Sequence, residues 1–475
     1  MRQTCEEIVA QFLRSHEYHD TLAAFEAERV YTQSDATAFP TVSRDLRTLI
    51  EHAASKAMAE QLANVSLTHD TQDDDILPTP ASPTSYTLQH TYEHLHTGNI
   101  LSIAPATYPG MEGPCVATTG ADKRIVFTNA TTGEVVGMLY KDAYGGHDAA
   151  VLDVSQASAY PSYAVTAGMD GKVIVWDLTC DRAVQTLKDH TKFVVRIAHS
   201  DDGRFMASAG YDKAIHIYEV VAHDGVPTYR HVHKMPVTTN PESILFVLGP
   251  VSPDGQPWST ERTWLVYTCR DNVELHYVAL PMSSPAPEAA PDWTMARYNT
   301  NPDPDDYHAG YSLVCILYTY PQLHLTLHPS GKYVAAQTGD HGGTDRIDST
   351  ANHSLSRLLL LPLFSQQRRT TLWTEAPSSA FANPRHAWTK AGDAVWVTGE
   401  DGLLRLVGLS GEILARVRCH GMAATSHSSA SVNAALAAAA WRQSGNTVIK
   451  GVAVLPDGRI ASCGFDKTVR VLHAC

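Results

Sequence analysis

Histidine is the residue type in this sequence that most clearly could take part in chemistry, because an imidazole can bind a metal or transfer a proton near neutral pH. Seven histidines lie in three close groups along the chain: His90, His94 and His96; His231 and His233; His324 and His328. A metal site needs a converging set of ligands, and the spacing within these groups is that of strands and loops. We therefore predict surface or hydrogen-bonding roles for these histidines, with neither a metal nor a cofactor.

The sequence lacks the short motifs that mark many enzyme active sites. It contains no HExxH, GxSxG or GxGxxG motif and no Walker-type glycine loop, the signatures of zinc proteases, serine hydrolases, dinucleotide-binding proteins and nucleotide phosphate sites. We therefore predict that the protein is not an enzyme and has no catalytic residues.

The composition is that of an acidic protein with enough apolar residues for a large core. The chain has 475 residues, 44% of them apolar, and a net charge of −14 from 36 Lys and Arg against 50 Asp and Glu. Residues 1–90 carry −8 of that charge, from 6 basic and 14 acidic residues. Proteins that coat nucleic acid are usually basic, and the local basic clusters at Arg368–Arg369 and at Arg416 and Arg418 are sparse. The charge therefore argues against direct binding of nucleic acid.

The cysteines and the apolar segments bear on the compartment. Eight cysteines are scattered along the chain without a CxxC pair, which argues against a zinc ribbon and against a dense disulfide framework. Glu6 and Glu7 stand where a signal peptide would be apolar. The longest apolar stretches, Leu358–Phe364 and Ala434–Ala440, fall far short of the roughly 20 residues that a membrane span needs. We expect a soluble protein of the cytoplasm, the nucleus or both.

Residues 4–30 have the pattern of two short helices. Thr4 and Glu7 form a capping box, which satisfies free amides at a helix start. Apolar side chains then fall on one face of each helix: Ile8, Phe12 and Leu13, followed by Tyr18, Leu22 and Phe25. Helices this short cannot bury these faces alone. They either pack on the main domain or bind a second copy of the chain.

The segment Glu6–Glu28 resembles a LisH motif, a helical hairpin that self-associates in many WD-repeat proteins. The matching positions are Ile8, Phe12, Leu13, Tyr18, Thr21, Leu22, Phe25 and Glu28. One position departs from the family pattern, because Glu17 stands where the family usually has a glycine that turns the chain. The resemblance implies a homodimer formed through residues 1–65, which include a third helix predicted over residues 43–65. Residues 66–85 are rich in proline and aspartate and read as a flexible linker.

A ten-residue pattern recurs along the rest of the chain. Four copies align without gaps: TTGADKRIVF at Thr118–Phe127, TAGMDGKVIV at Thr166–Val175, SAGYDKAIHI at Ser208–Ile217 and SCGFDKTVRV at Ser462–Val471. Weaker copies occur at Val397–Leu406 and Tyr267–His276. Each copy has an aspartate at a tight hairpin turn followed by an alternating strand. In the first and fourth copies and in the two weaker ones, the residues that mark the turns are Thr118, Asp122, Asp271, Asp401, Ser462 and Asp466.

This spacing is similar to that of the WD-repeat family, whose fold is a β-propeller of four-stranded blades. In that family a histidine before the first strand, a Ser or Thr in the second, the turn aspartate and a tryptophan in the third form a structural network. The resemblance assigns this network to His147, Thr166, Asp170 and Trp176 in one blade. In the next blade it assigns His190, Ser208 and Asp212, with Tyr218 in place of the tryptophan. The implied role is structural, because buried polar groups need partners.

The turn aspartates allow the blades to be counted. Six turns are marked, and the long gap between Asp271 and Asp401 needs one further blade, which we place at Leu323–Phe364. The predicted fold is therefore all-β, a seven-bladed propeller over residues 86–475, with a small α-helical segment before it. Tyr86–His90 is predicted to add the outer strand of the last blade and close the ring. Inserts near Ser252–Glu261, Ser283–Tyr307 and Gly339–Ser354 read as surface loops.

The function that follows is a non-enzymatic scaffold for protein–protein interaction, a propeller that is dimerised by its N-terminal helices and is a subunit of a larger intracellular complex. The architecture resembles that of lissencephaly-type dynein regulators, transcriptional corepressor subunits, splicing factors and ubiquitin-ligase components. Two alternatives stay open. One is a propeller that binds a small ligand or substrate in its central channel, which needs convergent charged residues there. The other is a subunit of an RNA-associated complex.

Overall fold

The computed structural model describes residues 85–141, 145–250, 261–270, 272, 274–281, 293–300, 324–338, 354–365, 370–378, 384–421 and 447–474. Contacts within the chain divide it into two compact units, Met1–Asp75 and Ile76–Cys475. Several predictions lie outside the described residues: the helices of residues 1–65 with Ile8, Phe12, Leu13, Tyr18, Leu22 and Phe25, nearly all of the linker, Arg368–Arg369, and the turn residue Asp271.

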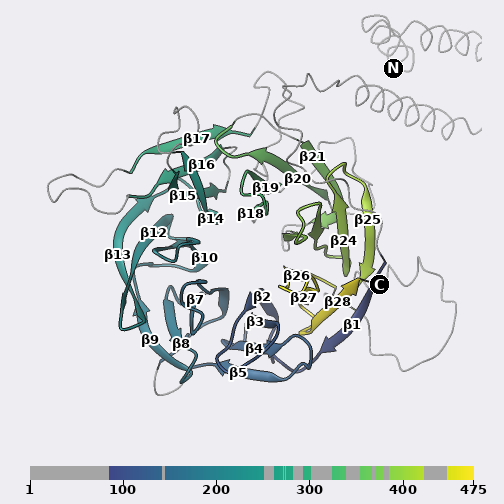
Figure 1. Ribbon diagram of the computed structural model, residues 1–475, viewed down its shortest axis with the longest axis horizontal. Coiled ribbons are helices and arrows are strands. Elements are labelled where there is room, and N and C mark those ends of the chain that lie inside the picture. Colours follow the sequence, from purple (N-terminus) through teal and green to yellow (C-terminus); the bar gives the residue numbers. More distant parts are fainter. Residues whose placement is uncertain are drawn as a thin grey trace, which may run out of the picture. The chain divides into compact units, whose positions relative to one another are not determined.

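The second unit consists of four-stranded antiparallel sheets arranged as the blades of a ring (Figure 1). Blade 1 contains β2 (Ile100–Ala106), β3 (Cys115–Gly120), β4 (Ile125–Asn129) and β5 (Val135–Leu139). Blade 2 contains β6 (Val151–Ser155), β7 (Tyr163–Gly168), β8 (Val173–Asp177) and β9 (Arg182–Leu187). Blade 3 contains β10 (Val194–His199), β11 (Phe205–Gly210), β12 (Ala214–His223) and β13 (Val226–Pro236).

The remaining blades have the same order of strands. Blade 4 contains β14 (Pro241–Pro250), β15 (Glu261–Cys269), β16 (Glu274–Ala279) and β17 (Met295–Asn299). Blade 5 contains β18 (Leu325–Leu327), β19 (Tyr333–Thr338), β20 (Ser354–Pro362) and β21 (Thr370–Ser378). Blade 6 contains β22 (His386–Trp388), β23 (Ala394–Val397), β24 (Leu403–Gly408) and β25 (Ile413–Arg418). Blade 7 contains β26 (Ile449–Val454), β27 (Ile460–Gly464), β28 (Val469–Ala474) and, from the start of the unit, β1 (Tyr86–Tyr92).

The ring is closed by strands from opposite ends of the unit. β1 pairs antiparallel with β28, from Tyr86 opposite Ala474 to Tyr92 opposite Val469, and the two strands lie side by side in Figure 1. An unpaired outer edge on blade 7 would expose backbone donors and acceptors that β1 now satisfies. The prediction of seven blades and the prediction that Tyr86–His90 closes the ring are both confirmed.

Two boundaries differ from the sequence prediction. The blade placed at Leu323–Phe364 exists, but its outer strand β21 lies beyond that range, at Thr370–Ser378. The segment Ser283–Tyr307 was predicted to be a surface loop, and this is wrong in part because it contains β17. This strand pairs with β16 and completes blade 4. Its five residues, MARYN, are too few for a clear period-two pattern between proline-rich neighbours.

The core lies between facing sheets. Between blades 2 and 3, for example, Val165 and Val175 pack with Met206 and Tyr218 in one buried cluster. Middle strands such as β11 are buried along their whole length, whereas the outer strand β9 alternates between exposed and half-buried residues up to its buried last residue. Full burial of one such apolar side chain contributes roughly 1.5–3 kcal/mol, so each pair of blades is held mainly by its apolar interface.

Two further predictions concern the environment of the chain. The described cysteines, Cys115, Cys180, Cys269, Cys419 and Cys463, are free thiols. No helix in the described part of the chain has the length and apolar character that crossing a bilayer requires.

Candidate functional site

The polar network expected in blade 2 is assembled with all four of its members. His147 Nδ1 lies 3.0 Å from Asp170 Oδ1, and His147 Nε2 lies 2.8 Å from Thr166 Oγ1. Trp176 Nε1 donates to the same Thr166 hydroxyl at 2.8 Å. Because the carboxylate can only accept, His147 donates to it from Nδ1. Asp170 also accepts the backbone amides of Asp148 and Lys172, which ties the turn to the loop before the first strand of the blade.

Blade 3 has the same network with a different third-strand residue. His190 Nδ1 is 2.9 Å from Asp212 Oδ1, and His190 Nε2 is 2.8 Å from Ser208 Oγ. Tyr218, which stands in the place of the tryptophan, is fully buried and donates its hydroxyl proton to Asp189 Oδ2 at 2.9 Å. The substitution therefore moves the third-strand hydrogen bond from the network to a neighbouring loop.

Blades 1 and 7 contain two further networks whose histidines the sequence analysis did not assign. His96 lies 2.9 Å from both Asp122 Oδ1 and Thr118 Oγ1. His420 lies 2.8 Å from Asp466 Oδ1 and 2.9 Å from Ser462 Oγ. The separation between histidine and aspartate is 26 residues in blade 1, close to the 23 and 22 of blades 2 and 3, so spacing could have found His96. In blade 7 it is 46 residues, because an insertion follows His420.

The networks keep their aspartates charged, and in blades 3 and 7 the surroundings favour the neutral form of the histidine. Burial tends to raise the pKa of Asp122, but the hydrogen bonds from His96 and from the amides of Thr97 and Arg124 outweigh it and lower that pKa to about 2. Burial lowers the pKa of His190 and of His420, against the opposing effect of the aspartate partner. A neutral, fully hydrogen-bonded histidine is poorly suited to proton transfer with a bound substrate, which supports a structural role.

The shared glycine of the repeats is required by the network itself. A Cβ on Gly168 would lie 2.4 Å from His147 Nδ1 and 2.6 Å from Asp170 Oδ1. The corresponding Gly120 and Gly210 are equally close to their own histidine–aspartate pairs. The glycine thus leaves the space in which the two side chains meet.

Blade 6 holds its turn aspartate in another way. Asp401 is bound by the buried Arg405, whose Nη1 donates to Asp401 Oδ1 at 3.1 Å. A Cβ on Gly399 would lie 2.6 Å from Asp401 Oδ1 and 2.8 Å from Arg405 Nη1. The guanidinium therefore occupies the place that the histidine ring has in the other networks. It comes from the strand after the turn, whereas the histidines come from the loop before the first strand of their blade.

The histidine groups of the sequence have distinct partners. His90 stacks on Tyr92, and His94 is exposed. His231 Nε2 is 2.8 Å from His216 Nδ1, while His233 stacks on Trp293. His324 Nδ1 is 3.2 Å from His386 Nδ1, and His328 Nε2 donates to the Gly392 carbonyl at 2.9 Å.

Potential ligand atoms do come close together in blade 3. Those of Asp189, His216 and His231 lie within 4.8 Å of one another, as do those of His190, Asp212 and His216. Direct hydrogen bonds between pairs of these side chains account for the closeness. The absence of a metal stays a prediction.

A hollow opens on the propeller surface where the loops of blades 2 and 3 meet. Its volume is about 390 Å³, and its lining includes Lys192, Phe193, Tyr211 and Lys213. The Phe193 side chain is 41% exposed, and its backbone carbonyl accepts the amide of Tyr211. Both lysines are exposed, and within the described residues neither side chain has a hydrogen bond or ion pair. The hollow thus offers an aromatic surface beside two positive charges.

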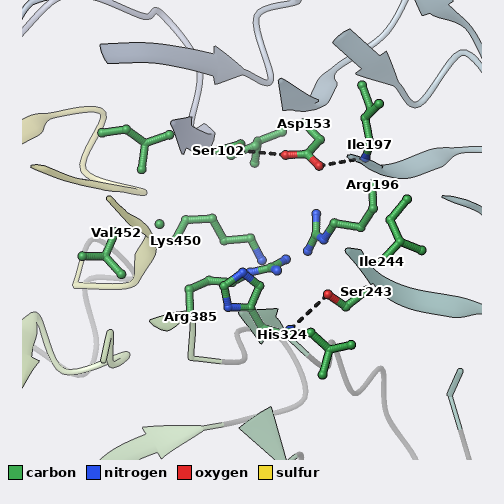
Figure 2. A pocket seen from close by; sticks show the side chains of 14 residues that line it. Ser102, Asp153, Arg196, Ile197, Ser243, Ile244, His324, Arg385, Lys450 and Val452 are labelled. Carbon is green, nitrogen blue, oxygen red and sulfur yellow. Dashed lines mark hydrogen bonds between the residues drawn. The ribbon is translucent and has the colours of Figure 1, made fainter. Parts of the chain in front are cut away.

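The central channel is lined by the innermost strand, or the residue before it, of every blade. A cavity of about 180 Å³ lies there (Figure 2). In every blade, one lining residue has the same register: it lies opposite the second-strand residue three positions before the turn aspartate. Arg196 lies opposite Ala209 in blade 3, and Gly451 lies opposite Cys463 in blade 7. In blade order these positions are Ser102, Asp153, Arg196, Ser243, His324, Arg385 and Gly451, which we call the channel ring.

Comparison with known proteins identifies the repeats. The family described as WD domain, G-beta repeat, matches residues 139–177, 181–219 and 425–472, which cover blade 2, most of blade 3 and most of blade 7. The propeller contains WD40 repeats. The other blades of this WD40 propeller share the topology without a match to the family. In blades 4, 5 and 6 the described residues contain no histidine–aspartate network.

Curated relatives match over short segments. The chain is 32% identical over 76 residues to the nuclear distribution protein nudF of Emericella nidulans, which is 16% of this chain and 17% of that protein. It is 29% identical over 119 residues to protein HIR1 of Coccidioides immitis, 23% of this chain and 11% of that protein. It is 27% identical over 100 residues to MST50-interacting protein 11 of Pyricularia oryzae, 20% of this chain and 31% of that protein. The match covers less than a third of each of these relatives.

Proposed function

We propose that this WD40 propeller is a non-enzymatic scaffold that binds other proteins as a subunit of a larger intracellular complex, in the cytoplasm, the nucleus or both. The supporting observation is the hollow between blades 2 and 3, because it presents binding groups on a rigid support. Phe193 supplies an apolar contact, and Lys192 and Lys213 supply positive charge. Aromatic residues that are partly shielded from solvent are frequent anchors of protein interfaces.

The partner expected at this hollow is a protein segment with an apolar side chain flanked by acidic residues. The apolar side chain would cover Phe193 and Tyr211, and the carboxylates would lie beside the two lysines. Such complementarity steers association as well as orienting the segment. The names of two relatives agree with a role in assemblies: one is a nuclear distribution protein and one an interacting protein of MST50.

The test compares the proteins that co-purify with three forms of the full chain. The first is unchanged, the second carries Lys192→Glu, Phe193→Ala and Lys213→Glu, and the third carries Val232→Ala and Lys234→Glu on the outer strand β13. The third form is the matched control, because both of its changed side chains are exposed. Proteins retained by the control and lost from the hollow variant support the proposal. Identical sets from all three forms would exclude this hollow as the docking site.

We further propose that the chain forms a homodimer through residues 1–65, since paired propellers gain avidity for a partner with two sites. Light scattering after size exclusion measures the mass of the full chain directly. The unchanged chain and an Arg14→Glu control should have twice the monomer mass, and Leu13→Glu with Leu22→Glu should have the mass of one chain. A monomeric unchanged chain would remove the dimer from the proposal and leave the scaffold role intact.

A further inference from the structure

Three side chains of blade 3 come together beside the polar network of its turn. His216 lies on β12, His231 lies on the outer strand β13, and Asp189 lies in the loop before β10. Each of the three offers a ligand atom within 4.8 Å of those of the other two. The imidazoles are the closest pair, with His216 Nδ1 at 2.8 Å from His231 Nε2. Two strands and a loop thus bring together the converging set of ligands that a metal site needs.

A β-bulge places the two histidines on one face of the blade. The register of β12 against β13 shifts between Ile217 and Tyr218. Val232 is the extra residue of β13, and His231 therefore lies opposite Tyr218. Directly opposite residues share a face of an antiparallel sheet, and so do residues two apart on one strand. His216 and His231 therefore share a face, whereas a regular register would have placed Val232 opposite Tyr218.

Hydrogen bonds leave part of this cluster unsatisfied. Within the described residues, the buried His216 has no hydrogen-bond partner for its Nε2. Asp189 Oδ2 accepts the Tyr218 hydroxyl at 2.9 Å, whereas its Oδ1 has no hydrogen bond in the same part of the chain. A carboxylate oxygen thus remains available beside a buried imidazole and the exposed ring of His231.

The surroundings keep His216 in the form that binds a metal. Burial, with repulsion from His190 and His231, lowers the pKa of His216 to about 4. Because a metal binds only a deprotonated imidazole nitrogen, this ring is ready as a ligand at neutral pH. Tyr218 also holds the carboxylate of Asp189, as hydrogen bonds from outside a metal site commonly orient its ligands.

We propose that Asp189, His216 and His231 bind a zinc ion, with water in the fourth position on the exposed side of His231. Two imidazole nitrogens and one carboxylate oxygen form a ligand set typical of a zinc site with an open position. The two nitrogens, now 2.8 Å apart, need to separate only to the roughly 3.3 Å of a tetrahedral site. His231 is exposed and has room for this shift. For His231, the proposal replaces the expectation of a hydrogen-bonding role without a metal.

A zinc ion here would join parts of blade 3 that are distant along the chain. It would link the loop before β10 to the outer strand β13. The same loop continues into Lys192 and Phe193, which line the hollow. Zinc would therefore stabilise the loop that supplies the hollow with its aromatic surface. The site itself requires no protein partner, so it stands or falls separately from the docking role.

The first experiment titrates zinc into the full chain, free of affinity tags, by calorimetry. We expect one site per chain, with affinity at least tenfold weaker in His231→Gln and in Asp189→Asn, which keeps an acceptor for Tyr218. The control His223→Gln changes an exposed histidine on the same hairpin and should leave the affinity unchanged. Mg²⁺, which prefers oxygen ligands, should not bind at the same concentrations. No zinc binding, or equal affinity in all folded forms, would overturn the proposal.

A second experiment identifies the ligands on the unchanged protein, so it remains decisive even where a variant does not fold. Co²⁺ takes ligand sets similar to those of Zn²⁺, and its visible absorption is much stronger in four- or five-coordinate sites than in six-coordinate ones. Thiolate ligands add an intense near-ultraviolet band. We expect strong visible absorption that zinc abolishes, without the thiolate band. A thiolate band would assign the metal to cysteines, and a weak six-coordinate spectrum would indicate loose surface binding; either result would overturn the proposed site.

Discussion

Blades 2 and 6 have one topology but hold their hairpin turns by different chemistry. In blade 2 the turn residue Asp170 meets a histidine from the preceding loop, whereas in blade 6 Asp401 meets Arg405 from the following strand. Blade 4 replaces the network with Arg270, which donates to the buried Glu242. The apolar interfaces between blades are common to all of them. The comparison teaches that apolar packing between blades determines the propeller fold, whereas several polar arrangements can stabilise its hairpin turns.

Titration with acid should distinguish the histidines that have an aspartate partner from those that have none, by the pH at which each takes up a proton. Burial alone lowers the pKa of His386 to about 3, and burial with repulsion from His190 and His231 lowers that of His216 to about 4. Since these folded-state pKa values lie below the unfolded value near 6.5, stability is full above pH 6.5 and is lost as pH falls toward 4. The loss is on the order of 3 kcal/mol for His216 alone.

The measurement follows denaturant unfolding against pH, together with histidine proton resonances of the folded protein. His190 and His420, which have aspartate partners, should titrate at higher pH than His216 and His386. A flat stability between pH 6.5 and 4.5 would contradict this difference.

Removal of the turn acid should destabilise blade 2 strongly. Asp170→Ala leaves His147 without its acceptor and frees two backbone amides, so we expect a loss of about 3 kcal/mol in the free energy of unfolding. The control Asp201→Ala removes an exposed carboxylate and should change stability by less than about 0.5 kcal/mol. An unchanged melting temperature for Asp170→Ala would show that the network does not support the blade.

The shared glycine should matter more in blade 2 than in blade 6. Gly168→Ala places its Cβ against the ring of His147, which two hydrogen bonds hold in place, and should cost about 2–3 kcal/mol. Gly399→Ala meets Asp401 Oδ1 and the end of Arg405, a flexible side chain that can shift, and should cost about 1 kcal/mol. Thermal unfolding of the two variants measures the difference, and equal losses would mean that the two arrangements are equally rigid.

The smallest effect is expected at the position where blade 3 departs from the tryptophan pattern. Tyr218→Phe removes one hydrogen bond to Asp189 but leaves the bonds among Ser208, His190 and Asp212. We expect a loss of about 1 kcal/mol in unfolding free energy. Tyr140→Phe, at a tyrosine that is 52% exposed, is the control and should not change it. A loss of several kcal/mol would instead place Tyr218 inside the network.

Sequence reasoning succeeded where the information was local. The turn aspartates, the Ser or Thr of the second strand and the glycine between them lie within five residues, so Thr166, Gly168 and Asp170 could be recognised together. It failed where a partner was displaced along the chain. His420 is separated from Asp466 by an insertion, and Arg405 replaces a histidine from the opposite side of its turn. The strand β17 was missed because five residues between proline-rich neighbours carry little periodic signal.

The sequence by itself determined that this chain repeats a small antiparallel sheet, because a hairpin turn and an alternating strand are short-range patterns. Only the tertiary structure decided which residues share the channel. Ser102 and Gly451 are far apart in the sequence and belong to no motif, yet ring closure through β1 and β28 places them at one level. Arg196 and Arg385 line one cavity for the same reason, since strands from different blades meet only when all seven sheets close around one axis.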